Sequence, residues 1–283
     1  MGKRVFMKFR VVIIAPSGNP HVAAFSELAV ALTSSIREVG HDCELKVNEL
    51  SNDSINIILG FHLLNKGDIP QGIRYIIYQL EQLSESEGWF PTHSSMLPIL
   101  KNAEAVWDFV NENVEFLRER GVNSSLLPVG FSKALSNIPQ NSSPNIDVLF
   151  YGSRNERRGK ILEELLAKGY RVKALFGIYG EERDRWIANS KLIINIHFYE
   201  ASLFESVRLS YLVNNSIPVI SESSSTYPWP KVPLIQADYD SLVERTEQAL
   251  KDPNLSDYGQ ECHLNFRENY SLSKLIEPLI GAI

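Results

Sequence analysis

Short apolar segments alternate with helical segments along almost the whole chain of 283 residues. The run Arg10–Ala15 consists mainly of apolar, β-branched residues. Between Val22 and Val39, apolar residues recur every three or four positions, as they do on the buried face of a helix. Repeated strand–helix units of this kind form parallel sheets that helices cover on both faces. The alternation therefore predicts an α/β fold.

One interruption of this alternation predicts two domains. Before it, further strands are expected at Cys43–Val47, Ile55–Leu59, Tyr75–Gln79, Ala103–Phe109 and Leu126–Val129. After it, strands are expected at Asp147–Tyr151, Arg171–Phe176, Lys191–His197, Ile217–Ser221 and Val232–Gln236. The interrupting stretch Ser132–Asn145 is rich in Ser, Asn and Pro and has no periodicity, which is typical of a linker. We expect Rossmann-like domains at residues 1–132 and 146–261 that face a cleft, with a C-terminal helix near 262–283 packing back on the first domain.

The charge balance narrows the functional classes. The net charge is −6 and the isoelectric point is about 5.6, which argues against bulk nucleic-acid binding.

Cys43 and Cys262 lie far apart and fit no metal-binding spacing, which favours a reducing, cytoplasmic setting. The apolar run near the start of the chain is too short to span a membrane, and we expect no cleavable signal.

Loops that follow strands are the places to look for a site, because open α/β sheets bind ligands outside the carboxyl ends of their strands. The first such loop of the second domain places Arg154, Arg157, Arg158 and Lys160 beside Gly152 at a helix start. Cationic side chains and a helix N-terminus together favour phosphate. The spacing matches neither a Walker loop nor the dinucleotide-binding glycine motif. For any one of these basic residues a solvated surface role is the alternative, whereas the cluster favours an anion site.

A second charged pair opens the helix before the last buried strand. Glu205 and Arg208 lie one turn apart at the start of that helix, after a strand and its loop. An arginine there can bind a diphosphate oxygen, and the carboxylate can accept from hydroxyls. The alternative is a simple ion pair between the two, worth a few tenths of a kcal/mol on an exposed helix.

The segment ESVRLSYLVNNSIPVISE, from Glu205 to Glu222, resembles the donor-binding helix and Pro-Val strand of GT-B glycosyltransferases. The segments DVLFYGSRNERR, AVWDFVNENVEFLRERGV and LLPVGF are similar to stretches of a bacterial branch of GT-B proteins, distantly related to spore-maturation CgeB-like proteins. The resemblance covers the chain from about Val106 to Glu222. It implies an enzyme that transfers a sugar from a nucleotide-diphosphate sugar to an acceptor hydroxyl, with no bound cofactor.

In that family the second domain binds the donor. The resemblance and the loop positions together assign donor binding to Gly152, Ser153, Arg154, Arg157, Arg158, Phe176, Gly177, Tyr179, His197, Glu205, Arg208, Leu209 and Ser210. One position departs from the family pattern. Retaining members carry a ribose-binding glutamate seven residues before the proline, and Tyr211 stands there in this chain. Either Glu205 replaces that glutamate or Tyr211 contacts the nucleotide differently.

The first domain is expected to hold the acceptor. His62, Glu81 and Asp108 follow strands and are candidate general bases, although Asp108 could simply cap a helix. The loop after the first strand offers Ser17, Gly18 and His21 to the acceptor. We expect no Asp-x-Asp metal pair at a strand end, and hence metal-independent transfer in which arginines and helix N–H groups stabilise the leaving diphosphate.

Other classes stay open at this stage. A two-domain binding protein would share the cleft but catalyse nothing. A nucleotide-sugar epimerase would need further acid–base groups, for which His197 and Glu200 are available. A phage-type transferase that glycosylates DNA has the same fold, but the acidic balance makes DNA an unfavoured acceptor. The acceptor could be a glycan, a small molecule or a protein.

Overall fold

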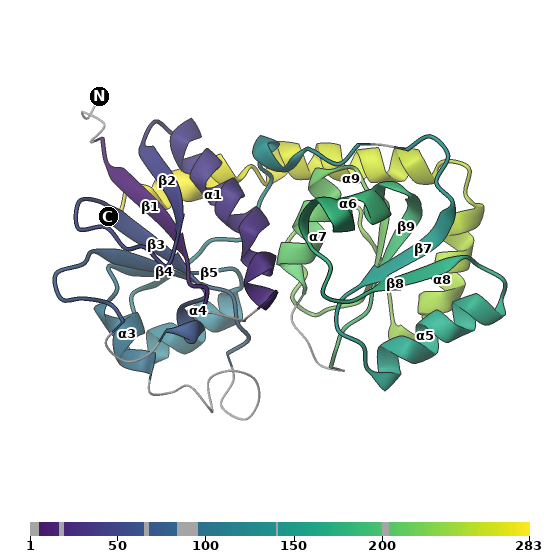
Figure 1. Cartoon of the computed structure of the whole chain (residues 1–283), viewed down its shortest axis with the longest axis horizontal. Helices are drawn as coiled ribbons and strands as arrows, with labels where there is room; N and C mark the ends of the chain where they lie inside the picture. Colours follow the sequence, from purple (N-terminus) through teal and green to yellow (C-terminus); the bar gives the residue numbers. More distant parts are fainter. Residues whose placement is uncertain (1–5, 17–19, 65–67, 84–95, 140, 200–203) are drawn as a thin grey trace. The chain divides into compact units, whose positions relative to one another are not determined.

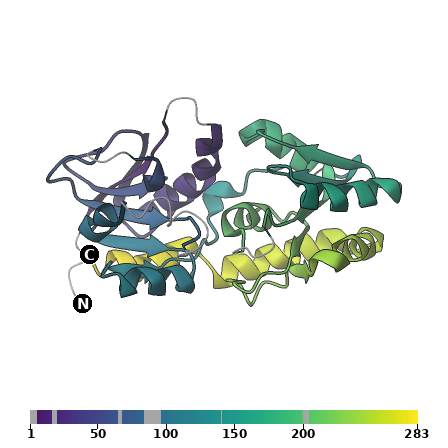
Figure 2. The same cartoon turned by 90° about the horizontal axis from the view of Figure 1, so that it is seen from below.

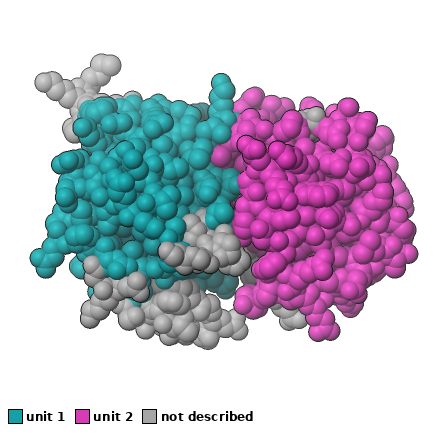
Figure 3. Space-filling model, viewed as in Figure 1, with its two compact units in different colours: residues 1–134, 271–283 teal, residues 135–270 magenta. Residues whose placement is uncertain are grey.

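The computed structural model describes residues 6–16, 20–64, 68–83, 96–139, 141–199 and 204–283. The chain forms two compact units (Figure 3). Unit 1 comprises residues 1–134 and 271–283, and unit 2 comprises residues 135–270. Each unit is built on one parallel sheet flanked by helices (Figure 1), so the predicted α/β class is confirmed.

The sheet of unit 1 has the strand order β2-β1-β3-β4-β5-β6, and every described pairing is parallel. Its strands are β1 (Lys8–Ile13), β2 (Asp42–Val47), β3 (Ile55–Leu59), β4 (Tyr75–Gln79), β5 (Ala105–Asp108) and β6 (Ser124–Leu126). Its helices are α1 (Ser26–Glu38), α3 (Leu97–Asn102), α4 (Asn111–Glu119) and α10 (Leu272–Ile280). Strands β3 and β4 are buried at every position, because they lie in the middle of the sheet and helices cover it.

The sheet of unit 2 has the order β11-β10-β9-β7-β8, again parallel throughout its described pairings. Its strands are β7 (Ile146–Tyr151), β8 (Val172–Leu175), β9 (Ser190–Asn195), β10 (Val219–Glu222) and β11 (Ile235–Ala237). Its helices are α5 (Glu156–Ala167), α6 (Gly180–Ala188), α7 (Ser206–Asn214), α8 (Leu242–Lys251) and α9 (Leu255–Asn269). Parallel pairing places the carboxyl ends of all five strands at one edge of this sheet.

The end of the chain divides between the units. The chain ends in two helices, because it leaves helical geometry at Tyr270 and Ser271. Helix α9 packs on α7 within unit 2, whereas α10 packs on α1 within unit 1 (Figure 2). The N–H of Leu272 donates to the carbonyl of Phe131 at 2.9 Å, which ties α10 to the chain segment that leaves unit 1.

The stretch predicted as a linker is partly packed. The side-chain oxygen of Asn215, just after α7, accepts the backbone N–H groups of Asn137 and Ile138, each at 2.9 Å. Leu135 and Ile138 are buried. Two apolar residues within a polar stretch thus anchor the first residues after the boundary to unit 2, which the overall composition concealed.

Candidate functional site

Five charged side chains gather where β7, β9 and β10 end in unit 2. They are Arg157, Arg158, Glu205, Arg208 and Glu222, here called the arginine–glutamate cluster. The three strands are neighbours in the sheet, so residues far apart in the sequence meet at its carboxyl edge. Three arginines face two glutamates, which leaves the cluster one positive charge in excess.

Arg158 is the buried centre of this cluster, with only 3% of its surface exposed. Its Nε donates to the carbonyl of Ile196 at 2.8 Å, and Nη1 donates to the carbonyl of Ser153 at 2.8 Å. Its Nη2 lies 3.1 Å from Oε1 of Glu205. Burial lowers the pKa of this guanidinium, and the neighbouring Glu205 opposes that shift. Arg158 therefore holds the loop after β7 and the carboxylate of Glu205 in fixed positions.

Arg208 lies nearer the surface on the other side of Glu205. Its Nη1 is 2.7 Å from Oε2 of Glu205 and donates to the side-chain oxygen of Asn195 at 3.0 Å. The guanidinium also lies over the ring of Tyr151. The Arg208 side chain is 22% exposed. The ion pair that competed with a donor-binding role is therefore present in the ligand-free protein.

Gly152 brings backbone close to this arginine. A Cβ atom at Gly152 would lie only 3.0 Å from Nη2 of Arg208, and its φ of +143° is unfavourable for other residues. Helix α7 begins beside the same arginine, and the side chain of its N-cap residue, Glu205, makes no capping hydrogen bond. The first N–H groups of a helix have no acceptor within the helix. An anion beside Arg208 could therefore reach both a guanidinium and a helix N-terminus.

Arg157 forms a second pair. Its two terminal nitrogens bind both carboxylate oxygens of Glu222, the last residue of β10. Its guanidinium stacks on the ring of Tyr239, 3.9 Å from the centroid. The carboxylate of Glu222 also accepts the backbone N–H of His197 at 2.9 Å. Arg157 is thus committed to protein partners, and the sequence reasoning missed both the cluster member Glu222 and the stacking residue Tyr239.

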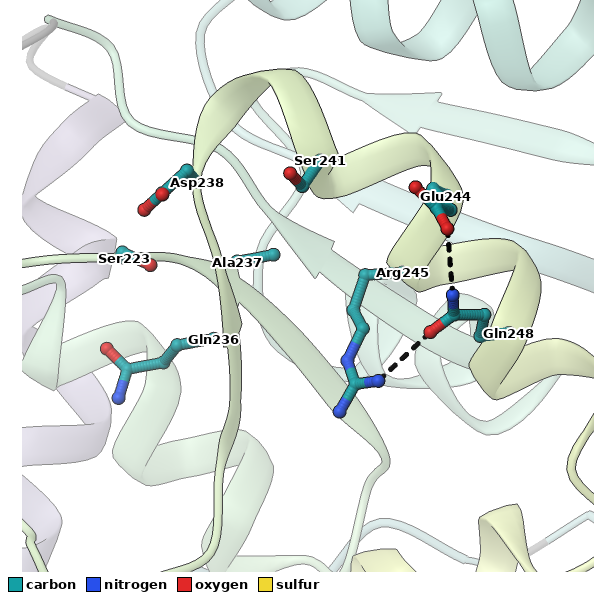
Figure 4. Close-up of a pocket in the computed structure, with 8 residues that line it drawn as sticks. All are labelled: Ser223, Gln236, Ala237, Asp238, Ser241, Glu244, Arg245 and Gln248. Atoms are coloured by element: carbon teal, nitrogen blue, oxygen red, sulfur yellow. Dashed lines mark hydrogen bonds between the residues drawn. The ribbon is translucent and has the colours of Figure 1, made fainter.

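A polar groove borders Arg157. Its volume is about 780 Å³, and it is lined by Asn155, Glu156, Arg157, Lys160, Asp238, Tyr239 and Asp240. A smaller hollow of about 400 Å³ shares Asp238 with this groove (Figure 4). On its α8 side, Arg245 and Glu244 both hydrogen-bond to Gln248.

The residues that line the groove contradict the expectation that no Asp-x-Asp pair stands at a strand end. Asp238 and Asp240 form an Asp-x-Asp pair directly after β11, at the strand end where none was expected. Within the described part of the chain, no group of three or more His, Cys, Asp or Glu side chains is arranged to hold a metal ion.

Several residues predicted to bind the donor lie in the core, in the segment after β8 or on the surface, and not in the arginine–glutamate cluster. Leu209 is fully buried in the core, and the Ser210 hydroxyl donates to the carbonyl of Val207 at 2.9 Å, so both side chains serve the packing of α7. Gly177, with a φ of +69°, and Tyr179, the N-cap of α6, lie between β8 and that helix. Phe176 and Arg154 are exposed to solvent.

Tyr211 occupies the position of the missing family glutamate, and it has a structural role. Its hydroxyl lies 2.8 Å from a carboxylate oxygen of Asp184 and 3.0 Å from the side-chain oxygen of Asn137. The side chain is buried, and the guanidinium of Arg183 lies over its ring. Tyr211 therefore joins α6, α7 and the segment at the start of unit 2.

In unit 1, the structure brings two of the candidate bases together. His62 follows β3 and Glu81 follows β4, two neighbouring strands. Nδ1 of His62 lies 3.4 Å from Oε1 of Glu81, and both side chains are partly exposed. Ser17 and Gly18 lie outside the described residues. His21 lies in a short 3₁₀ helix, Pro20–Phe25, and its side chain is likewise outside the description.

Asp108 is not a surface base. Its side chain is fully buried, and it accepts hydrogen bonds from the side chains of Gln79 and Asn113 and from the N–H of Val110. Burial raises its pKa to about 8 despite these donors. Gln79 and Asn113 in turn hold the backbone of Glu81. Asp108 therefore supports the segment that presents Glu81 and cannot itself reach an acceptor.

The folds of glycosyltransferases match this chain over almost its full length. A trehalose-6-phosphate synthase from Burkholderia multivorans has a TM-score of 0.63 at 10% identity and covers 98% of both chains. Sucrose-phosphate synthase from Thermosynechococcus elongatus has a TM-score of 0.59 at 12% identity, covering 98% of this chain and all of its own. The T4 phage enzyme BGT, in complex with UDP and Mn²⁺, has a TM-score of 0.59 at 11% identity over 98% and 99% of the two chains. The predicted GT-B fold is confirmed.

Relatives by sequence come from a virus, and no family model matches the chain. The uncharacterised protein L138 of Acanthamoeba polyphaga mimivirus is 32% identical over 128 residues, 43% of this chain. L140 of the same virus is 24% identical over 222 residues, which are 74% of this chain and 71% of L140. The chain spans only 14% of L138 and 24% of L137, a third viral relative. None of the described helices is long and apolar enough to cross a membrane.

Proposed function

We propose that this protein is a glycosyltransferase that moves a sugar from a nucleoside diphosphate sugar to an acceptor hydroxyl. One observation carries the proposal: the guanidinium of Arg208, in the first turn of α7, lies beside Gly152, and the N-cap side chain of that helix makes no capping hydrogen bond. In a GT-B fold this combination of guanidinium, close backbone and helix N-terminus suits a diphosphate. The UDP complex of the similar phage enzyme supports a nucleotide ligand of this kind.

In this proposal, Arg208 exchanges Glu205 for the diphosphate when the donor binds. Arg208 is the more exposed arginine of the two that share Glu205. A diphosphate can attract it away from Glu205, while the buried Arg158 keeps that carboxylate in place. The excess positive charge of the cluster favours the bound anion. As the glycosidic bond breaks, Arg208 and the N–H groups of α7 stabilise the charge that develops on the leaving diphosphate.

His62 and Glu81 supply the acceptor chemistry in this proposal. The carboxylate orients the imidazole and stabilises its protonated form, so that His62 takes the proton from the acceptor hydroxyl as the new bond forms. This arrangement suits an inverting transfer. Tyr211 adds support, because the position of the ribose glutamate of retaining enzymes is committed to Asp184 and Asn137 here.

The first test is donor binding. A thermal-shift panel of UDP, GDP, ADP and CDP with their sugars identifies the base, and calorimetry then compares the wild type with Arg208→Ala. Loss of a charge-assisted contact should weaken binding by roughly ten- to a hundred-fold. Arg171→Ala is the matched control, because Arg171 pairs with Asp147 at the opposite edge of the sheet. Equal affinities in wild type and Arg208→Ala would exclude the phosphate role.

Turnover distinguishes the remaining classes. A binding protein would bind the nucleotide sugar without releasing nucleoside diphosphate, and an epimerase would return an altered nucleotide sugar. Release of nucleoside diphosphate that depends on an added acceptor is the result expected of a transferase.

A further inference from the structure

His197 is a buried residue with one unused nitrogen. It follows β9, and only 1% of its surface is exposed. Its backbone N–H binds Glu222, and its Nε2 lies 3.2 Å from the carbonyl oxygen of Ser223. Its Nδ1 is buried and has no hydrogen-bond partner among the residues that the structure describes. Buried polar atoms are rarely left unsatisfied, so this nitrogen indicates a group that joins the site later.

The hydrogen bond to Ser223 determines whether the ligand group at Nδ1 of His197 must be a donor or an acceptor. A carbonyl oxygen can only accept, so Nε2 of His197 carries the hydrogen. When the ring carries only that hydrogen, Nδ1 of His197 holds a lone pair and is an acceptor that requires a donor.

The group that faces this nitrogen is another acceptor. Oε1 of Glu205 lies 4.0 Å from Nδ1, beyond hydrogen-bond distance. Arg158 and Arg208 fix the carboxylate of Glu205 from other directions. Two acceptors so close together suit neighbouring hydroxyl groups, each of which donates to one of them. A cationic ligand fits poorly, because the cluster already carries excess positive charge.

We infer that His197 is a specificity-determining residue that accepts a hydrogen from one hydroxyl of the bound donor, while Glu205 accepts from the adjacent hydroxyl. The inference rests on the proposed function. The ligand group is a vicinal diol, which both the ribose and the transferred sugar contain.

The test compares hydroxyl and deoxy ligands in wild type and variants by calorimetry. The probes are UDP with 2′-deoxy-UDP and 3′-deoxy-UDP, and UDP-glucose with UDP-2-deoxyglucose, or the same set on another base that binds in the panel. In the wild type, either the ribose ligands or the glucose ligands should show a preference of about ten-fold for the hydroxyl form over the deoxy form. The set that shows the preference tells whether His197 and Glu205 bind the ribose or the transferred sugar. His197→Phe should abolish the preference, and His197→Gln, whose amide oxygen can accept, should keep part of it.

His263→Phe is the matched control, since His263 contacts a backbone carbonyl of α7 in the same unit. It should leave the preference unchanged. Equal binding of hydroxyl and deoxy ligands by the wild type in every arm overturns the inference. Uniform weakening of all ligands by His197→Phe also overturns it, because a structural or phosphate-binding role acts that way. If the unmodified diphosphates fail to bind at all, the proposed function itself fails, and this outcome is visible before the deoxy ligands are used.

Discussion

Each unit is built on its own parallel sheet, but the two units arrange their charged side chains differently. Unit 2 gathers five charged side chains at its strand ends in two ion-paired groups with excess positive charge. Unit 1 buries one carboxyl, Asp108, among neutral amides, and keeps His62 and Glu81 partly exposed. In the proposed function, one fold type serves two tasks. Paired charges suit the binding of an anion, whereas a partly exposed imidazole–carboxylate pair suits transfer of a proton.

The largest expected effect concerns the exposed pair of unit 1. His62→Ala should lower turnover by about a hundred- to ten-thousand-fold, the usual contribution of a general base. Donor affinity in calorimetry should not change, because the donor contacts are proposed in unit 2. Steady-state assays of diphosphate release provide the measurement, with His41→Ala, on the turn before β2, as the control. A parallel loss of donor affinity would show that the units do not divide the tasks in this way.

The buried carboxyl of unit 1 should make stability depend on pH. The pKa of Asp108 is about 8 in the folded protein, well above its ordinary value of 3.8. Between about pH 4 and pH 8 the folded protein keeps a proton that the unfolded chain has released, so stability falls as pH rises. The contribution is at most about 1.4 kcal/mol per pH unit.

Urea unfolding of wild type and Asp108→Asn at several pH values between about 5 and 8 checks this dependence. The difference in unfolding free energy between the two proteins should shrink as pH rises. Asp147 and Glu247, whose pKa values are lowered by Arg171 and Lys168 respectively, lose their stabilising effect only in more acidic solution. A difference that is constant with pH would mean that Asp108 is ionised throughout.

Unit 2 should respond most strongly to loss of its buried arginine. Removing one partner of a buried ion pair commonly costs about 3–5 kcal/mol. Arg158→Ala should approach the lower end of that range, because Glu205 keeps Arg208 as a partner. Urea unfolding followed by circular dichroism measures the change. A loss similar to that of the exposed control Arg171→Ala would show that burial contributes little to this cluster.

The smallest effect is expected from metal ions. If arginines stabilise the leaving diphosphate, EDTA should leave turnover unchanged, and added Mn²⁺ or Mg²⁺ should alter turnover by less than about two-fold. The Asp-x-Asp pair in the groove makes this test specific. Strong stimulation by Mn²⁺ that disappears in Asp238→Asn or Asp240→Asn would replace the metal-independent proposal with a metal site at β11.

Local pattern predicted the sheets well. Strands β3 and β4 have the predicted bounds, because uniform apolar runs between turn residues indicate central strands. The pairing of Glu205 with Arg208 could also be foreseen, since residues three apart on a helix are neighbours. Helix α3 was not predicted, because it is only six residues long and carries no clear periodicity.

Contacts between distant positions could not be predicted. Arg158 and Glu205 are 47 positions apart, and Arg157 and Glu222 are 65 apart, so no local spacing relates them. The sequence leaves Asp108 as either a candidate base or a helix cap, because a strand-end position is the same for a buried and an exposed carboxyl. The sequence placed His197 at a strand end and among the donor-binding residues, but it could not show that Nδ1 lacks a partner among the described residues, because that depends on packing around three strand ends.

The placement of α10 has a consequence for synthesis. Unit 2 is a continuous segment inserted into unit 1, so the ribosome completes residues 135–270 before it makes α10. Until then the face of α1 that receives α10 has no cover from that helix. The second unit can therefore close before the first.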